Sequence, residues 1–94
     1  MTPLFIPLTT HWFTQYQQGK KTTEYRPYGK RWNEQTCLVG REVTLSKGYG
    51  KHHRLKAIIT GFEQSTTATT SLDWQAVYGE RGGIAACIHM RLLP

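Results

Sequence analysis

The sequence has few of the features that mark secreted, membrane-spanning or disulfide-bonded proteins. Only two of its 94 residues are cysteines, Cys37 and Cys87, which favours reduced thiols in the cytoplasm. The first residues lack the positive charge and apolar run of a secretory signal. The best candidate for a membrane span, Ile84 to Leu93, contains His89 and Arg91 and is much shorter than the roughly 20 residues a bilayer requires. We therefore expect a soluble cytoplasmic protein.

The sequence also lacks the residue spacing that is typical of a metal-binding site. Cys87 and His89 share a face of the predicted last strand, and His52 and His53 are neighbours. Neither pair has the C-x-x-C or H-x-x-x-H spacing of a well-defined site. We expect no metal and no cofactor.

Acidic residues are scarce, with 6 Asp and Glu against 12 Lys and Arg and a net charge of +6. The imbalance is concentrated between residues 20 and 56, where ten basic and three acidic side chains give +7 and leave −1 for the remainder. The ten are Lys20, Lys21, Arg26, Lys30, Arg31, Arg41, Lys47, Lys51, Arg54 and Lys56. Such a segment attracts phosphates or another acidic partner.

The chain is long enough for one domain, residues 1–94, and its first half mixes strand and helix patterns. Leu4 to Ile6 lies between two prolines and predicts a short strand at a sheet edge. Aromatic residues on one helical face predict a helix from Thr10 to Gln18, ended by Gly19. An extended segment then runs to Pro27, and residues 28–40 have no steady period and predict a long loop.

The second half predicts mostly strands. Residues 41–47 and 55–63 alternate between apolar and polar side chains, and the basic, glycine-containing segment Gly48 to His53 joins them as a hairpin tip. After a solvated link at 65–70, Ser71 caps a short helix that carries Leu72, Trp74 and Val77, and Gly82-Gly83 end it. A last strand covers 84–93. This order predicts an α+β domain, with a small curved sheet or partly closed barrel flanked by two short helices.

The most specific motif lies where the first helix is followed by a strand. The segment from Gly19 to Arg26 fits the pattern G-x-K-x-x-E-x-R at Gly19, Lys21, Glu24 and Arg26. In this motif the chain resembles the ASCH domain family of the PUA-like superfamily, whose pattern often continues with an aromatic residue such as Tyr28. Residues 43–48 resemble the family's next strand and turn. The resemblance implies a PUA-like barrel with a cleft beside it that suits RNA or a nucleotide.

The residues themselves are compatible with such a cleft. In an extended segment Glu24 and Arg26 point to one face, and Lys21 at the bend after Gly19 can turn toward them. A lysine, a glutamate and an arginine in one concave place can bind phosphate, orient a base edge or transfer a proton. The alternative is a surface strand with an ion pair.

Aromatic residues lie among the basic ones, and their faces can stack on unpaired bases. The expected ligand-binding residues are Lys21, Glu24, Arg26, Tyr28, Arg31, Lys47, Tyr49, Lys51 and Arg54. The cleft is formed by Lys21, Glu24, Arg26 and Tyr28. Phosphates are contacted by Arg31, Lys47, Lys51 and Arg54. In the alternative interpretation Tyr25 and Trp32 are core residues, and we expect burial for Trp12, Phe13, Phe62 and Trp74.

Three functions remain open. The first is binding of RNA or a modified nucleoside in the cleft. The second is catalysis by Lys21 as base, with Glu24 orienting it. Some small bacterial members of the family hydrolyse N4-acylated cytidine, but their threonine nucleophile aligns with Glu24 here, and Thr23 should face away.

Cleavage of RNA without a metal is a related possibility, for which Lys21, Tyr49, Lys51, His52 and His53 supply candidate groups. The third function is a protein-interaction domain whose basic face binds an acidic partner. Its interaction with that partner would be insensitive to nuclease.

Overall fold

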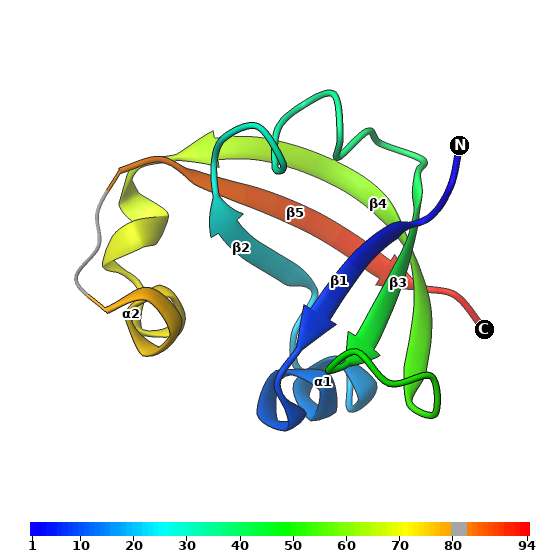
Figure 1. Ribbon diagram of the computed structural model, residues 1–94. Coiled ribbons are helices and arrows are strands. Elements are labelled where there is room, and N and C mark those ends of the chain that lie inside the picture. The colour runs from blue at the N-terminus through cyan, green and yellow to red at the C-terminus, as the bar shows by residue number, and fades with distance from the viewer. Residues whose placement is uncertain (80–82) are drawn as a thin grey trace.

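The computed structural model describes residues 1–79 and 83–94. Their secondary structure confirms the expected α+β class (Figure 1). The elements in chain order are β1 (Leu4–Leu8), α1 (Thr10–Gln17), β2 (Thr23–Pro27), β3 (Glu42–Lys47), β4 (Arg54–Ser65), a 3₁₀ turn (Thr67–Thr70), α2 (Leu72–Tyr78) and β5 (Ala85–Leu92).

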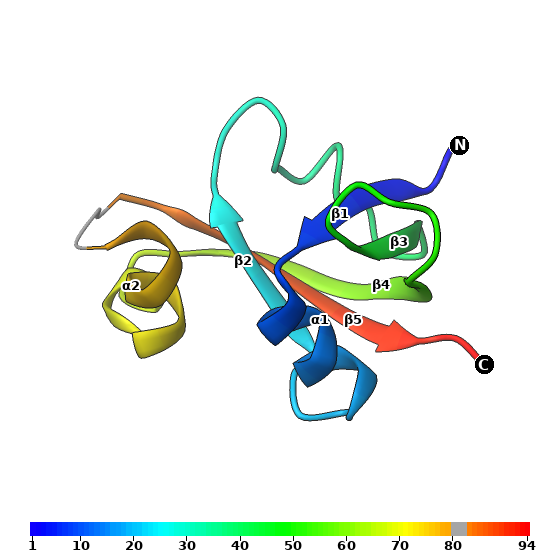
Figure 2. The ribbon, with the colours of Figure 1, turned by 60° about the horizontal axis from the view of Figure 1, so that its bottom comes forward.

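The five strands form one mixed sheet in the order β1-β3-β4-β5-β2. β1 runs parallel to β3, and every other pair is antiparallel. The 12-residue strand β4 pairs with β3 near its start and with β5 further along, and its register with β5 shifts between Ile59 and Gly61. A shift of this kind bends a strand and increases its twist. The sheet consequently curls into a half-barrel whose two edge strands are β1 and β2 (Figures 1 and 2).

Helix α1 connects the two edge strands and lies at the end of the half-barrel where β1 ends and β2 begins (Figures 1 and 2). The Thr9 side chain accepts from the Trp12 amide at its start, and Gly19, with φ of 74°, follows its end. The helix buries Phe13 and Tyr16 in the core. The predicted edge position of β1 and the predicted helix are therefore both confirmed.

The core has two parts, one on each face of the sheet. The larger part fills the half-barrel with apolar side chains such as Ile6, Val43, Leu45, Ile59 and Ile88, each 0–1% exposed. The smaller part lies under α2 and consists of Trp74, Ala85 and Cys87, with Tyr25 and Tyr78 packed against it. Both cysteines are buried free thiols, and burial raises the pKa of each.

The region before β5 differs from the sequence-based prediction. Ser65 still belongs to β4, and Thr67–Thr70 forms a 3₁₀ turn where a solvated link is expected. Ser71 caps α2 as predicted, by accepting from the Trp74 amide. The helix ends at Gly79, before the expected Gly82-Gly83 break. The φ of Gly79 is 64°, a conformation that favours glycine. Gly82 lies outside the described residues.

Among the helices of the described residues, none has the length and apolar character needed to span a membrane.

Candidate functional site

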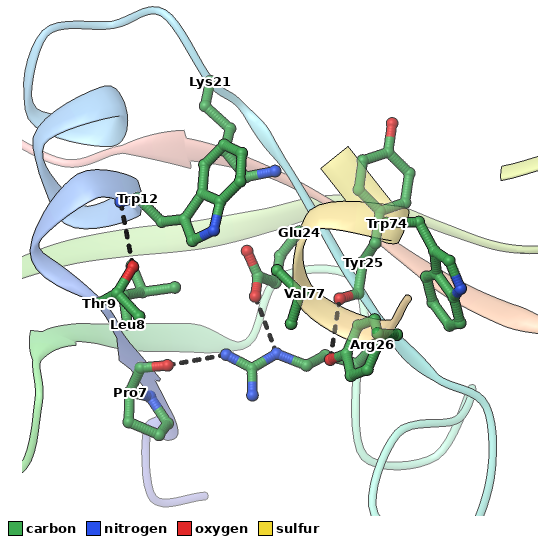
Figure 3. Close-up of a pocket in the computed structure, with 11 residues that line it drawn as sticks. Pro7, Leu8, Thr9, Trp12, Lys21, Glu24, Tyr25, Arg26, Trp74 and Val77 are labelled. Atoms are coloured by element: carbon green, nitrogen blue, oxygen red, sulfur yellow. Dashed lines mark hydrogen bonds and ion pairs between the residues drawn. The ribbon is translucent and has the colours of Figure 1, made fainter. Parts of the chain in front are cut away.

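A pocket lies where the half-barrel fails to close, between the two edge strands and the two helices (Figure 3). We call it the edge pocket. It encloses about 150 Å³. Its lining residues are Pro7, Leu8 and Thr9 at the end of β1, Trp12 of α1, Lys21, Glu24, Tyr25 and Arg26 on and before β2, and Trp74, Val77 and Tyr78 of α2.

The pocket contains all three polar residues of the motif. On β2 the side chains of Glu24 and Arg26 point to the same side of the strand, because side chains two apart in a strand share a face. Lys21 precedes the strand and reaches the same pocket (Figure 3). The predicted convergence of Lys21, Glu24 and Arg26 is therefore observed, and they do not form a flat surface strand.

Glu24 is a buried carboxylate with two protein partners. The residue is 7% exposed, the Tyr16 hydroxyl donates to Oε1 at 2.9 Å, and Nε of Arg26 donates to Oε2 at 2.8 Å. Burial, followed by the nearby Glu24 charge, raises the pKa of Tyr16 far above its usual value, so this hydroxyl stays a donor. Each carboxylate oxygen can accept more than one hydrogen bond, which leaves capacity for a ligand.

Arg26 links the two edge strands through its side chain. Its Nη2 donates to the carbonyl oxygen of Pro7 in β1 at 2.8 Å, while Nε is bound to Glu24. Its Cζ lies 5.0 Å from the centroid of the Trp32 ring, a cation–π distance. Among the described residues, Nη1 has no hydrogen-bond partner.

The Lys21 ammonium is surrounded by aromatic rings. Its Nζ lies 4.9 Å from the ring centroid of Trp12, 5.0 Å from that of Tyr25 and 5.8 Å from that of Tyr16. The negative faces of aromatic rings attract a cation at these distances. The lysine is thus held at the pocket wall, where its positive charge can meet an anionic or electron-rich group.

Tyr28 lies outside the edge pocket, contrary to the expected cleft. Its hydroxyl donates to Glu34, and its ring centroid lies 6.4 Å from that of Phe62. The hydrogen bond from Tyr28 and a second from Gln64 lower the pKa of Glu34, and the same contact raises the pKa of Tyr28. Tyr28 follows the end of β2, and its ring packs against the larger core beside Phe62 instead of lining the edge pocket.

The remaining predicted residues lie on exposed surfaces. Arg31 is exposed, and its Cζ is 5.0 Å from the Trp32 ring centroid. Lys47, Lys51 and Arg54 are exposed at the start, middle and end of the β3–β4 connection. None of these four residues lines the edge pocket.

The hairpin tip, Gly48–His53, is tied to the end of β1 beside the pocket. The Gly48 amide donates to the Leu8 carbonyl at 2.8 Å, and the Ser46 hydroxyl donates to the Gly50 carbonyl at 3.2 Å. Gly48 has φ of 69°, which a side chain would strain. These contacts fix the tip next to Leu8, itself a lining residue of the edge pocket.

Sequence reasoning missed two aromatic contributors to the site. Trp12 is expected in the core but is only partly buried and lines the pocket beside Lys21. Tyr16 is buried as a core residue, yet its hydroxyl binds Glu24. Their i, i+4 spacing on α1 puts them on one face, and the motif follows that helix directly. The signal available in the sequence was that the hydroxyl of a buried Tyr16 needs a hydrogen-bond partner.

A second polar cluster lies on the outer face of the sheet. The Thr23 hydroxyl is 2.8 Å from Nδ1 of His89, and Nε2 of His89 is 3.2 Å from Oε1 of Glu63. Gly61 leaves room for the imidazole, because a Cβ there would meet His89 Cδ2 at 3.4 Å. The His89 and Glu63 side chains are 41% and 64% exposed, and none of the three residues lines the edge pocket. We infer that this cluster has a structural role, in which its side chains connect β2, β5 and β4.

No protein-family model matches this chain, and a search of the curated proteins finds no match. The resemblance to ASCH domains therefore stays a prediction that depends on the motif and the fold.

Proposed function

We propose that this protein is an ASCH-type RNA-binding domain that holds one unpaired nucleobase in the edge pocket. The observation that carries the proposal is the joint presence of Lys21, Glu24 and Arg26 around one hollow with aromatic walls. Aromatic faces next to arginine and lysine are the usual means by which proteins bind unpaired bases. The +7 segment that contains the motif supplies the attraction for the phosphates.

The size of the pocket favours a single small ring. A protein cavity of about 150 Å³ accommodates one benzene-sized molecule. A pyrimidine ring has that size, whereas a complete nucleotide does not fit and must leave its ribose and phosphate outside. The pocket therefore suits a base that has been turned out of a strand.

The polar groups favour a base with an amino group. A glutamate accepts a hydrogen bond from the exocyclic N4 amine of cytosine. Glu24 provides such an acceptor, and Arg26 provides donor groups in the same pocket. Their positions are fixed by Tyr16 and Pro7, so little side-chain freedom is lost when a ligand binds. Cytosine is the base that best combines the volume with this donor and acceptor pair.

Binding can be measured with cytidine 5′-monophosphate and with short single-stranded RNA by calorimetry at low salt. We expect both to bind, and we expect Lys21→Ala and Glu24→Gln to weaken both. Lys20→Ala is the matched control, because this neighbouring lysine is exposed and does not line the pocket. Absence of binding at low salt, or equal loss with Lys20→Ala and Lys21→Ala, contradicts the proposal.

Hydrolysis of N4-acylated cytidine or of RNA is the second candidate function. It is favoured by the presence of a lysine and a carboxylate in one pocket, a pair that can act in proton transfer. The nucleophile of the related hydrolases is replaced by Glu24, and Thr23 faces His89 on the other side. Incubation with acylated cytidine and labelled RNA, beside Lys21→Ala, tests it. No turnover, or turnover that Lys21→Ala leaves unchanged, excludes this candidate.

A further inference from the structure

An aromatic and basic surface lies beside the edge pocket and is not used by it. The Tyr49 ring at the hairpin tip stacks on Phe5 of β1, with centroids 6.0 Å apart and an interplanar angle of 30°. Cζ of Arg54 lies 5.4 Å from the Phe5 ring centroid. We call Phe5, Tyr49 and Arg54 the stacking platform.

The platform is open to solvent and has a defined shape. Tyr49 is 80% exposed, although its ring contacts Phe5. Nε of Arg54 donates to the Gly50 carbonyl at 3.3 Å, the same oxygen that accepts from Ser46. These bonds join the tip to β3 and β4, and the bond from the Gly48 amide to the Leu8 carbonyl joins it to β1, so the backbone that carries Tyr49 is held on both sides. An exposed, positioned tyrosine on a basic hairpin is suited to stacking on a base.

The charge around the platform favours a phosphate backbone. Residues 47–56 contain four basic side chains, Lys47, Lys51, Arg54 and Lys56, and no acidic one. All four are exposed. A nucleic-acid strand that stacks a base on Tyr49 brings its phosphates within reach of these cations.

The platform and the edge pocket follow one another along β1. Phe5 and Pro7 are two residues apart in the strand, so their side chains share a face and lie about 7 Å apart. Pro7 lines the pocket, and Phe5 belongs to the platform. That spacing exceeds the 3.4 Å between stacked bases in a helical strand. Two neighbouring bases can occupy both places only if they are unstacked from one another.

We propose that the stacking platform is a second base subsite, so that the ligand is an unpaired RNA strand of at least two nucleotides whose bases are splayed apart. One base enters the edge pocket, and its neighbour stacks on Tyr49. This inference rests on the proposed function of the pocket and adds that a free nucleoside or nucleotide fills only part of the site.

The test compares cytidine 5′-monophosphate with a hexamer of cytidine RNA, by calorimetry, on the wild type, Tyr49→Ala and Tyr49→Phe. The hexamer should bind the wild type more tightly than the mononucleotide. Tyr49→Ala should weaken the hexamer about 5- to 100-fold, the range for loss of one base–aromatic stack, and leave the mononucleotide unchanged. Tyr49→Phe should retain hexamer binding, because its ring still stacks.

Other outcomes separate the two proposals. Binding of the mononucleotide with no gain for the hexamer, or a hexamer affinity unchanged in Tyr49→Ala, overturns the second subsite and leaves the pocket intact. Failure of both ligands to bind the wild type overturns the pocket function and with it the subsite. Equal weakening by Tyr49→Ala and Tyr49→Phe also overturns the stacking role.

Discussion

The edge pocket and the hairpin tip are both rich in cations, yet they use charge differently. In the pocket, Arg26 and Glu24 are largely buried, bound to one another and to the edges of the sheet. On the hairpin, Lys51 and Arg54 are exposed, and the tip is held mainly by backbone carbonyls and amides. The pocket's charges should therefore matter for folding as well as binding, and those of the hairpin for binding alone.

The largest expected effect is on stability, from Glu24→Ala. This change leaves Arg26 partly buried without its partner and removes the acceptor of the Tyr16 hydroxyl. Breaking a buried ion pair from one side costs about 3 kcal/mol or more. Urea denaturation measures the free energy of unfolding. Glu63→Ala, on a 64% exposed side chain, is the control and should change it by less than about 0.5 kcal/mol. Equal losses of unfolding free energy in Glu24→Ala and Glu63→Ala would contradict the distinction between buried and exposed charge.

The next effect is on binding and separates the two regions directly. Lys21→Ala should weaken cytidine 5′-monophosphate and the RNA hexamer by the same factor, about 10- to 100-fold, as expected for a lost charged hydrogen bond. Lys51→Ala should weaken only the hexamer, because Lys51 lies outside the pocket. Calorimetric titrations of the two variants with both ligands measure this. A Lys51→Ala effect on the mononucleotide contradicts the separation.

A smaller effect concerns salt. Each phosphate of a single strand that protein cations neutralise contributes about −0.7 to the slope of log affinity against log salt. With three contacts, affinity for the hexamer should fall about 20-fold between about 50 and 200 mM salt. The double variant Lys47→Ala/Lys51→Ala should make the slope less negative by about 1.4. An unchanged slope would mean that the hairpin lysines do not contact phosphate.

The smallest expected effect is a pH dependence from the loop after β2, which belongs to neither region. Hydrogen bonds from Tyr28 and Gln64 lower the pKa of Glu34 from its usual value of 4.5. A lowered pKa in the folded state means stability that is present above pH 4.5 and is lost as the pH falls through the folded value. Denaturation of wild type and Glu34→Gln between pH 6 and roughly pH 3 should converge toward the acid end. Parallel curves would contradict this role for Glu34.

Much of the fold follows from local sequence patterns. Each of three local patterns predicts an element near its observed place: the apolar run between Pro3 and Pro7 for β1, the aromatic face and Gly19 for α1, and the alternation in β3 and β4. The parallel pairing of β1 with β3 and the bend in β4 depend on long-range packing. No local pattern reveals them, so the gap that forms the pocket was not predictable in detail.

The motif was a better guide to the site than the basic residues around it. Lys21, Glu24 and Arg26 fall within six consecutive positions. Strand geometry puts Glu24 and Arg26 on one face, and Lys21 reaches the same pocket from the bend before β2. Tyr28 lies outside the edge pocket, and Trp12, which packs against the core as expected, also lines the pocket beside Lys21. Whether each predicted residue contacts a ligand stays a prediction.

A ¹H–¹⁵N NMR titration with cytidine 5′-monophosphate shows directly where the base binds. We expect shifts of the Trp12 indole and of the amides from Lys21 to Arg26, with the hairpin tip unaffected until the RNA hexamer replaces the mononucleotide. Shifts confined to residues 48–53, or spread evenly over all exposed cations, would contradict a base held between Lys21, Glu24 and Arg26.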